Sequence, residues 1–209
     1  MKIKTIRSFD PNYQISKEIW QKIFNEIRFT PSSFDLQPWR FFIISTNENK
    51  KKLQKYMIGN LQQIQNSSAI VLLCGNIQKV EKSQYIYENK LKNKIISLEQ
   101  KEIILKQIKK HYHNMKKQTL KNEIFFECGL IACNLVITLQ KFNYDTCFMG
   151  GCHFNKLNEL FNIEKKYIPI ILIAVGRQNS NDITTRKITT NINKSSTFKL
   201  NINDFVNFL

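Results

Sequence analysis

The sequence predicts a globular protein of the α/β or α+β class. Its 209 residues suit one domain with a sizeable core, or at most two small ones. Short apolar segments of strand length alternate with segments whose apolar residues recur at helical spacing, which is typical of the mixed classes. One helical segment, residues 123–140, is apolar on nearly every side and predicts a buried helix. Spacing alone leaves the order of the strands open.

The first half of the chain contains two predicted helices and two predicted strands. Apolar residues of the segment 15–27 fall on one helical face, and Ser16 is a suitable N-cap. The segment 68–75 is apolar throughout, which predicts a strand in the centre of the sheet. Between these two lie a turn at 30–33, a strand at 40–45 and a helix at 47–56.

The second half opens with a polar insertion. Residues 77–122 are rich in Lys, Gln and Glu and contain no Pro or Gly, so we expect one or two exposed helices that leave the core. The apolar helix at 123–140 follows, and its surface favours packing on the sheet and against a second subunit. The later elements are strands at 145–149 and 168–175, a short helix at 155–161 and a C-terminal arm at about 189–209. We expect one domain over residues 1–209.

The composition is that of an ordinary globular protein, apart from its charge. Hydrophobic residues make up 42% and charged residues 23% of the chain, and the net charge is +16. A basic surface can bind nucleic acid. The alternative, which we favour, is that solvated lysines are spread over the surface, because the runs at 50–52, 106–110 and 116–121 lie apart. We therefore expect no nucleic-acid partner.

The cysteines and the N-terminus indicate a soluble cytoplasmic protein. The five cysteines form no C-x-x-C pair, which favours buried thiols in a reducing compartment. The N-terminal residues contain no apolar run of the secretory type. The most apolar stretch, 124–139, includes Glu127 and Asn134 and is too short to cross a bilayer comfortably. We expect no membrane partner.

Missing motifs narrow the possible chemistry. The six glycines cannot form G-x-G-x-x-G or a P-loop, so a Rossmann or Walker-type phosphate site is excluded. His111 and His113 point in different directions on a helix, and no G-x-S-x-G is present, so neither a metal nor a catalytic triad is expected. An enzyme with this sequence would depend on a bound cofactor.

Three segments together resemble the FMN-dependent nitroreductase family. The first is KTIRSFDP at 4–11, followed by a helix, and the second is TPSSFDLQPWRF at 30–41, similar to the family's Pro-Ser-Ser-x-Asn-x-Gln-Pro-Trp stretch. The third combines FMGG at 148–151, the strand ending at Gly176 and the basic pair at 186–187. The resemblance covers roughly residues 3–75 and 123–188. The insertion between them is variable in the family and helps to shape the substrate entrance.

The resemblance implies a fold, a cofactor and an activity. The implied fold is α+β, a three-layer α/β/α sandwich with a mainly antiparallel central sheet and a buried central helix at a dimer interface. Two copies would share each FMN site. NADH or NADPH would pass a hydride to the flavin, which then reduces a nitroaromatic, a quinone or a similar small acceptor. No side chain need act as a nucleophile.

The N-terminal segment supplies the first implied flavin ligands. By resemblance Lys4, Thr5 and Arg7 bind the cofactor, with Thr5 at the phosphate or ribityl chain and Arg7 near N1 and O2 of the reduced ring. Alternation in an extended segment would place Thr5 and Arg7 on one side. Alone, these would be exposed polar residues. The family usually has Arg where this chain has Ile3, and Lys4 or Lys2 could compensate.

The turn before the first strand supplies the second set. By resemblance Pro31, Ser32, Ser33 and Asp35 come from the second subunit and close over the flavin. Asp35 replaces the usual Asn, which keeps an acceptor but loses the amide donors and adds charge. Alone, the segment would be a turn in which Ser and Asp satisfy local backbone groups.

Two more sets complete the implied site. Asn60 and Gln63 resemble two polar positions that contact the ring, and because relatives often carry Lys at the second, Arg7 would carry more of the charge. Gly150 and Gly151 would let the backbone approach the ring, with an N–H for N5. Gly150 stands where many relatives have Glu. The basic pair that would bind the phosphate is Arg186 and Lys187.

Two other functions remain open from the sequence. The altered positions Ile3, Asp35, Gln63 and Gly150 would suit a flavin-binding protein of the same fold without catalysis. The basic charge would suit a nucleic-acid-binding protein, but no basic groove with stacking aromatic residues is evident.

Overall fold

The computed structural model describes residues 3, 5–179 and 199–208. Lys4 and residues 180–198 lie outside this part, as do the first two residues and the last. Two compact units are present, Met1–Gln178 and Asn179–Leu209, and the strands of the described residues belong to the first.

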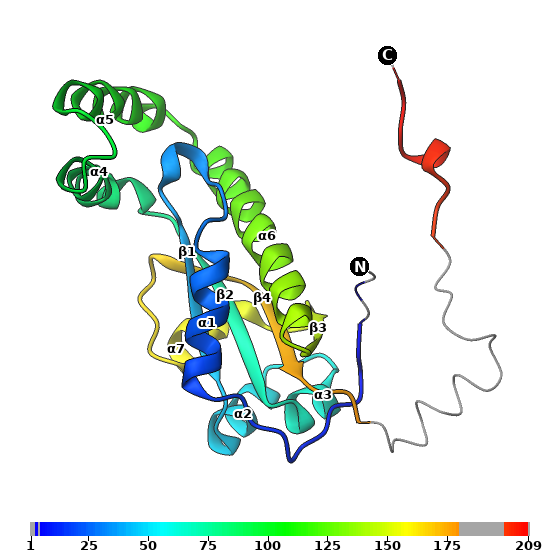
Figure 1. Cartoon of the computed structure of the whole chain (residues 1–209). Helices are drawn as coiled ribbons and strands as arrows, with labels where there is room; N and C mark the ends of the chain where they lie inside the picture. Colours follow the sequence, from blue (N-terminus) through cyan, green and yellow to red (C-terminus); the bar gives the residue numbers. More distant parts are fainter. Residues whose placement is uncertain (1–2, 4, 180–198, 209) are drawn as a thin grey trace. The chain divides into compact units, whose positions relative to one another are not determined.

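A four-stranded antiparallel sheet forms the centre of the first unit (Figure 1). The strands are β1 (Trp39–Ile44), β2 (Ala69–Asn76), β3 (Asp145–Met149) and β4 (Tyr167–Gly176). Their order is β1-β2-β4-β3, and every neighbouring pair is antiparallel. The strand β2 is interior and buried along its whole length, which confirms the prediction of a central strand for 68–75.

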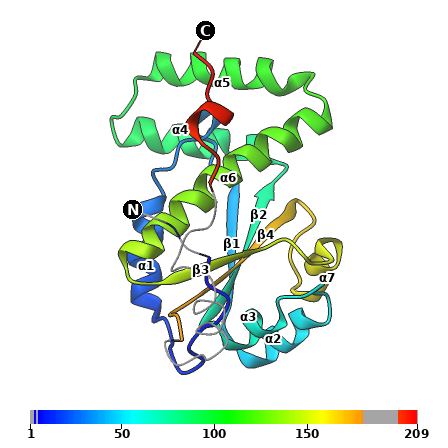
Figure 2. The same cartoon turned by 90° about the vertical axis from the view of Figure 1, so that its right-hand side faces the viewer.

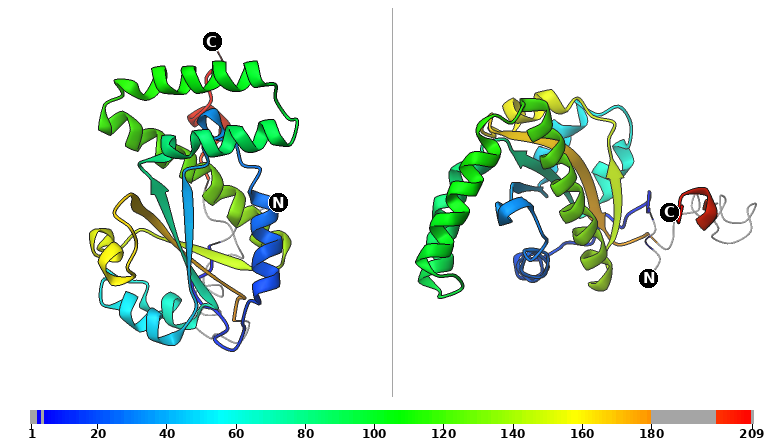
Figure 3. Two further views of the ribbon diagram at one scale, coloured as in Figure 1. Left: turned by 90° about the vertical axis from the view of Figure 1, so that its left-hand side faces the viewer. Right: turned by 90° about the horizontal axis from the view of Figure 1, so that it is seen from above.

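Helices cover both faces of this sheet, as Figure 3 shows from above. The α-helices are α1 (Lys17–Ile27), α2 (Asn47–Gln54), α3 (Leu61–Asn66), α4 (Ser83–Lys92), α5 (Leu98–His113), α6 (Lys117–Lys141) and α7 (Leu157–Leu160). Helices α1 and α6 pack on one face, and α2, α3 and α7 lie on the other. The predicted α+β sandwich with three layers is therefore confirmed.

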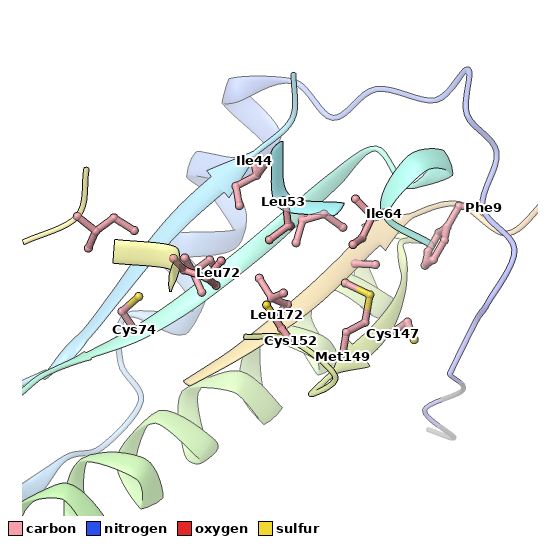
Figure 4. Close-up of a cluster of buried hydrophobic side chains, with 14 of the residues drawn as sticks. Phe9, Ile44, Leu53, Ile64, Leu72, Cys74, Cys147, Met149, Cys152 and Leu172 are labelled. Atoms are coloured by element: carbon pink, nitrogen blue, oxygen red, sulfur yellow. The ribbon is translucent and has the colours of Figure 1, made fainter. Parts of the chain in front are cut away.

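Alternation along the strands divides the core into two clusters. Leu72 and Leu172 point to the face with α2, α3 and α7, where Leu53 and Ile64 meet them (Figure 4). The next residues along the same strands point to the face with α1 and α6. Both clusters contain fully buried aliphatic side chains, so both faces of the sheet are tightly packed. The sheet therefore gives the loops at its ends a rigid support.

The helix α6 is longer and less enclosed than predicted. It begins at Lys117, whereas the sequence pattern indicated residue 123. Ile131 and Leu135 are buried against the sheet, but Phe125 is 48% and Phe126 68% exposed. Within one chain the helix is therefore not buried on every side, because only one of its faces meets the sheet.

The helix α6 has 25 residues and is long and apolar enough to cross a membrane. The stretch 124–139, which was expected to be too short to cross a membrane, lies inside this longer helix. Half of its most apolar window is buried inside the structure. Core helices share this length and composition, and α6 is the core helix of the first unit.

Several other elements follow the sequence closely. Ser16 caps α1 by accepting the backbone N–H of Ile19 at 3.4 Å, as predicted. The strand β3 has the predicted bounds, and the insertion at 77–122 contains α4 and α5. The predicted helix at 155–161 is split into a 3-10 turn, η3 (Phe154–Lys156), and α7, and α3 was not anticipated.

Not every lysine is a solvated surface residue. Lys50 is only 5% exposed, and its ammonium donates to the carbonyl of Ser67 at the end of α3. Burial lowers the pKa of the Lys50 ammonium. Lys79, in the 3-10 turn η2 (Lys79–Lys82), is 1% exposed. For these two positions the expectation of solvated lysines was wrong.

The second unit is described for residues 199–208. It contains one 3-10 turn, η4 (Ile202–Asp204), with reciprocal hydrogen bonds between Asn201 and Asp204. Leu200, Ile202 and Phe205 are each more than half exposed.

Candidate functional site

The N-terminal segment runs beside the edge strand β3. Thr5 forms a parallel bridge with Thr146, and the N–H of Ile6 donates to the carbonyl of Thr146 at 3.1 Å. Ile6 and Ser8 are buried, whereas Thr5 and Arg7 are exposed. The alternation expected for this segment is present, with the two polar side chains facing outward together.

Arg7 lies near the thiol of Cys147 on β3. Burial raises the pKa of this thiol, and the positive charge of Arg7 acts in the opposite direction. Arg7 thus brings a positive charge to the edge of the sheet, two residues from the exposed Thr5.

Gly151, which follows β3, meets the loop before α3, and the elements β3 and α3 can be followed in Figure 2. The N–H of Ile58 donates to the carbonyl of Gly151 at 2.8 Å, and a Cβ on Gly151 would lie 3.1 Å from the Ile58 carbonyl oxygen. Gly150 is exposed, and no atom lies within 4 Å of the position that its Cβ would take. Gly151 is therefore packed against the neighbouring loop, whereas Gly150 is exposed to solvent.

Asn60 and Gln63 belong to the same loop and the start of α3. Asn60 has a left-handed backbone with φ of 56°, and its side-chain oxygen accepts from Gln63 Nε2 at 3.1 Å. Gln63 is 8% exposed. A hydrogen bond thus links Asn60 and Gln63 to each other. The hydrogen bond between Ile58 and Gly151 holds their loop beside the segment that follows β3.

The turn before β1 has a strained backbone. Phe34, Asp35 and Gln37 have φ of 49°, 50° and 48°, values that side chains disfavour. Ser32 Oγ accepts the N–H of Gln37 at 3.0 Å, and Gln37 Nε2 reaches Asp35 Oδ1 at 3.1 Å. The Asp35 carboxylate also pairs with Lys90 on α4 at 2.7 Å, which compensates its charge.

A cluster of buried charged groups lies under this turn. Lys79 Nζ is 2.5 Å from Glu123 Oε1 and 2.8 Å from Glu127 Oε2, and Glu127 Oε1 accepts the N–H of Ser33 at 2.7 Å. The hydroxyl of Tyr112 donates to Glu123 at 2.5 Å. We call Lys79, Tyr112, Glu123 and Glu127 the buried ion cluster. It joins the insertion to α6 and to the turn.

The surroundings change the acidity of two members of this cluster. Burial would raise the pKa of the Glu123 carboxyl, but hydrogen bonds from Lys79 and Tyr112 outweigh it, and the pKa is lowered. Burial, together with the bond to Glu123, raises the pKa of Tyr112. Tyr112 therefore stays protonated and Glu123 ionised at neutral pH.

Sequence reasoning did not find this cluster. Glu127 was considered only as a charge within an apolar helix, and Lys79 only as part of a polar insertion. The available signal was the spacing of Glu123 and Glu127, which puts two carboxylates on one face of a helix. That signal does not identify the cation, which lies 44 and 48 residues away.

One chain does not bring the turn to the other expected site residues. The turn precedes β1 and the glycine pair follows β3, and these strands form opposite edges of the sheet, three spacings of about 4.8 Å apart. In the register of the sheet, Trp39 of β1 pairs with Gly75 of β2, which pairs with Ile168 of β4. Thr146 of β3 pairs with Val175 of β4, seven residues away from Ile168 along β4. This seven-residue offset puts Thr146, which bridges to Thr5, about 23 Å along the strands from the start of β1, and Met149, which pairs with Leu172, is offset by four residues or about 13 Å. The expected residues therefore form two separate groups.

The first group comprises Thr5, Arg7, Asn60, Gln63, Gly150 and Gly151, and the second Pro31, Ser32, Ser33 and Asp35. The expected residues Lys4, Arg186 and Lys187 lie outside the described residues.

The first group fits a flavin mononucleotide. This ligand needs a cation and a hydroxyl for its anionic parts and open backbone beside its flat ring. Arg7 and Thr5 are exposed with their side chains on one side, and Gly150 leaves its surroundings free of side-chain atoms. The fold and this surface define a class, the α+β flavin-dependent oxidoreductases.

Comparison with known proteins gives the family. The model of the Nitroreductase family matches residues 2–177, and the chain belongs to this family. The Bacillus subtilis protein YdgI, named as an NAD(P)H nitroreductase, is 29% identical over 175 residues, which are 83% of this chain and 84% of YdgI. The CLA biosynthesis enone reductase of Lactiplantibacillus plantarum is 30% identical over 190 residues, 88% of this chain and 85% of that enzyme.

A solved structure shows the same fold with a flavin. It is a protein of Exiguobacterium sibiricum, named as a nitroreductase, in complex with FMN. This structure is 28% identical with a TM-score of 0.89 and covers 99% of this chain and 93% of that one. The chain is accordingly an NAD(P)H-dependent oxidoreductase with FMN as its cofactor, as the sequence resemblance implied.

Proposed function

We propose that two copies of this chain form a homodimer with FMN between them, and that the enzyme passes a hydride from NADH or NADPH to a small electron-poor acceptor. The observation that carries this proposal is the separation of the two groups of site residues. The turn at Ser32–Ser33 precedes β1 at one edge of the sheet, whereas Arg7 lies in the segment beside β3 and Gly150 follows β3 at the other edge. A second copy can supply the missing group.

The exposed face of α6 supports such a dimer. A groove of about 380 Å³ runs beside this helix, and its lining is almost entirely apolar. Residues along it include Phe125, Cys133, Val136, Phe148 and Ile170. Exposed apolar patches of this kind are typical of interfaces. Covering the groove with a second copy would also remove the exposed aromatic rings of α6 from water.

Each group has a distinct role in this proposal. Thr5 and Arg7, with Lys4, Arg186 and Lys187, hold the phosphate and the polar side of the flavin, and Gly150–Gly151 border its ring. Bound FMN supplies the two-electron chemistry. Arg7 supplies positive charge on the side where reduction adds negative charge. Asn60 and Gln63 donate or accept hydrogen bonds at the ring edge.

The turn of the second copy closes over this site. Pro31, Ser32, Ser33 and Asp35 exclude water from the ring and narrow the space for the nicotinamide and the acceptor. The Lys90 partner of Asp35 makes the replacement of Asn by Asp compatible with a bound anion, because the added negative charge is paired.

The acceptor we propose is a nitroaromatic, a quinone or a similar conjugated small molecule. The names of the relatives, a nitroreductase and an enone reductase, support an electron-poor π system as the shared chemistry. We place the enzyme in the cytoplasm, which suits its five free cysteines.

Spectroscopy and kinetics test the proposal together. The purified protein should elute as a dimer, be yellow, and bleach under anaerobic conditions with NADH or NADPH. Addition of a quinone should restore the colour. A monomer that stays colourless with excess FMN would contradict both the cofactor site and the dimer. A flavin-loaded protein that NAD(P)H does not reduce would contradict the hydride transfer alone.

A further inference from the structure

We propose that Glu127 and the insertion helices α4 and α5 are a clamp that positions the Ser32–Ser33 turn for the flavin of the partner subunit. The proposal rests on the proposed function, because only the shared site gives the turn a ligand. Its basis is a set of contacts from three helices, α4, α5 and α6, onto one strained segment; Figure 1 shows where these helices lie.

The turn needs external support. Three of its four residues from Phe34 to Gln37 have a left-handed backbone, and none of the three is glycine. Such conformations persist only where surrounding contacts over-determine them, and they gather at functional sites. The bonds between Ser32, Asp35 and Gln37 lie within the turn and give it shape, but they do not fix its place on the fold.

Helix α6 holds the turn from below. Glu127 is 1% exposed, and one of its oxygens accepts the Ser33 N–H while the other accepts from Lys79. Hydrogen bonds to an ionised acceptor are stronger than neutral ones. The carboxylate can remain ionised in this buried place because Lys79 pairs with it. Lys79 thus acts through Glu127 and is a positioning residue.

Helix α4 holds the turn from the side. The hydroxyl of Tyr87 donates to the carbonyl of Phe34 at 2.9 Å, and Lys90 pairs with Asp35. Leu36 is 1% exposed and packs with Tyr87 and with Ile108 of α5. Phe34, Asp35 and Leu36 are therefore each fixed by contacts with residues of the insertion.

Helix α5 completes the clamp with aromatic contacts. The Phe34 ring lies 5.5 Å from His111 and 6.1 Å from Tyr112, measured between ring centroids. Tyr112 also donates to Glu123 of the buried ion cluster. A pure packing role would be filled as well by apolar residues, because buried ion pairs contribute little net stability. The hydrogen bonds of the buried ion cluster instead give the turn a single defined position.

Amide hydrogen exchange of the flavin-free protein tests the clamp without depending on the cofactor. In Glu127→Leu and in Tyr87→Phe, we expect amides of residues 32–37 to exchange at least about tenfold faster than in the wild type, because each variant removes one hydrogen bond to the turn. Glu127→Gln keeps an acceptor for Ser33 and should remain within about threefold. Tyr85→Phe is the matched control, since the Tyr85 side chain is on the same helix and Tyr85 is 69% exposed.

Flavin titration tests the positioning role. Glu127→Leu and Tyr87→Phe should raise the Kd for FMN about tenfold and change the visible circular dichroism of the bound flavin, with recovery in Glu127→Gln. Should Glu127→Leu not fold, Tyr87→Phe decides, because it removes a single hydroxyl. Wild-type exchange rates and wild-type Kd in Tyr87→Phe would overturn the clamp. Faster exchange without any effect on Kd would overturn its positioning role. A wild-type protein that binds no FMN would contradict the proposed function instead.

Discussion

The backbone N–H of Ser33 donates to the carboxylate of Glu127 at 2.7 Å, across 94 residues of sequence. This bond joins the turn before the first strand to the core helix α6. The same carboxylate meets the buried ammonium of Lys79, so a segment expected to contact the cofactor rests on an ion pair that is excluded from water.

Replacing Lys79 by Met should destabilise the protein strongly. The substitution leaves Glu123 and Glu127 facing each other without a cation, and breaking a buried pair from one side costs about 3–5 kcal/mol. Urea unfolding at pH 7 measures this loss. The double variant Lys79→Met/Glu123→Gln, which has the net charge of the original cluster, should recover part of the stability. A loss below about 1 kcal/mol in the single variant would mean that the pair is not buried as described.

Acid should weaken the fold through Glu123. Its pKa is lowered from 4.5 in the folded protein by Lys79 and Tyr112, against the effect of burial. A carboxyl with a lowered folded pKa contributes stability that is complete above its unfolded pKa and is lost as the pH falls through the folded pKa. The unfolding free energy should therefore fall below about pH 4.5. In Glu123→Gln the unfolding free energy should depend less on pH in this range. An unchanged dependence on pH would show that Glu123 is not the group responsible for it.

Removing the charge of Arg7 should weaken flavin binding. Arg7→Ala deletes the exposed cation beside Thr5, and charge-assisted bonds are strong enough that we expect the Kd for FMN to rise about tenfold or more. Arg7→Lys keeps the charge, and its Kd for FMN should lie between those of the wild type and of Arg7→Ala. The quenching of FMN fluorescence on binding measures the Kd of each variant. Equal affinities in all three proteins, with equal rates of reduction by NADPH, would place Arg7 outside the site.

The reactivity of the cysteine thiols tests whether the exposed face of α6 is covered in the dimer. Burial raises the pKa of Cys74 and of Cys128 to about 12, so neither should react with a disulfide reagent in the folded protein. Cys133 is exposed in one chain and lines the apolar groove. In the homodimer we expect it to be covered and slow to react. Rapid modification of Cys133 in a protein that sediments as a dimer would place the interface elsewhere.

The sequence predicted the elements that depend on local pattern. A continuous apolar run indicated β2, and a single capping serine marked the start of α1. These features repeat over neighbouring residues, so they are visible without knowing the fold. The antiparallel sheet and the three layers came only from the family resemblance, and the strand order was left open.

Contacts between distant residues were beyond such a pattern. The buried ion cluster needs Lys79 from the insertion and Glu127 from α6, and nothing in either segment alone identifies its partner. The exposed rings of Phe125 and Phe126 were likewise read as buried, because an apolar helix looks the same whether the sheet or a second subunit covers it. The left-handed residues of the turn carry no glycine, which hid their strain.

The most direct test of the shared site is flavin binding by a mixed dimer. One chain carries Arg7→Ala, and the other carries Ser33→Pro, which removes the N–H that Glu127 accepts. Differently tagged chains allow the heterodimer to be purified, and each homodimer of a variant serves as a control with weak binding at both sites. If each site joins Arg7 of one chain to the turn of the other, the heterodimer has one intact site and one doubly altered site. We predict one FMN bound with wild-type affinity per heterodimer. Binding as weak as in the two parent homodimers would contradict the shared site, because it would show that Arg7 and the turn act within the same chain.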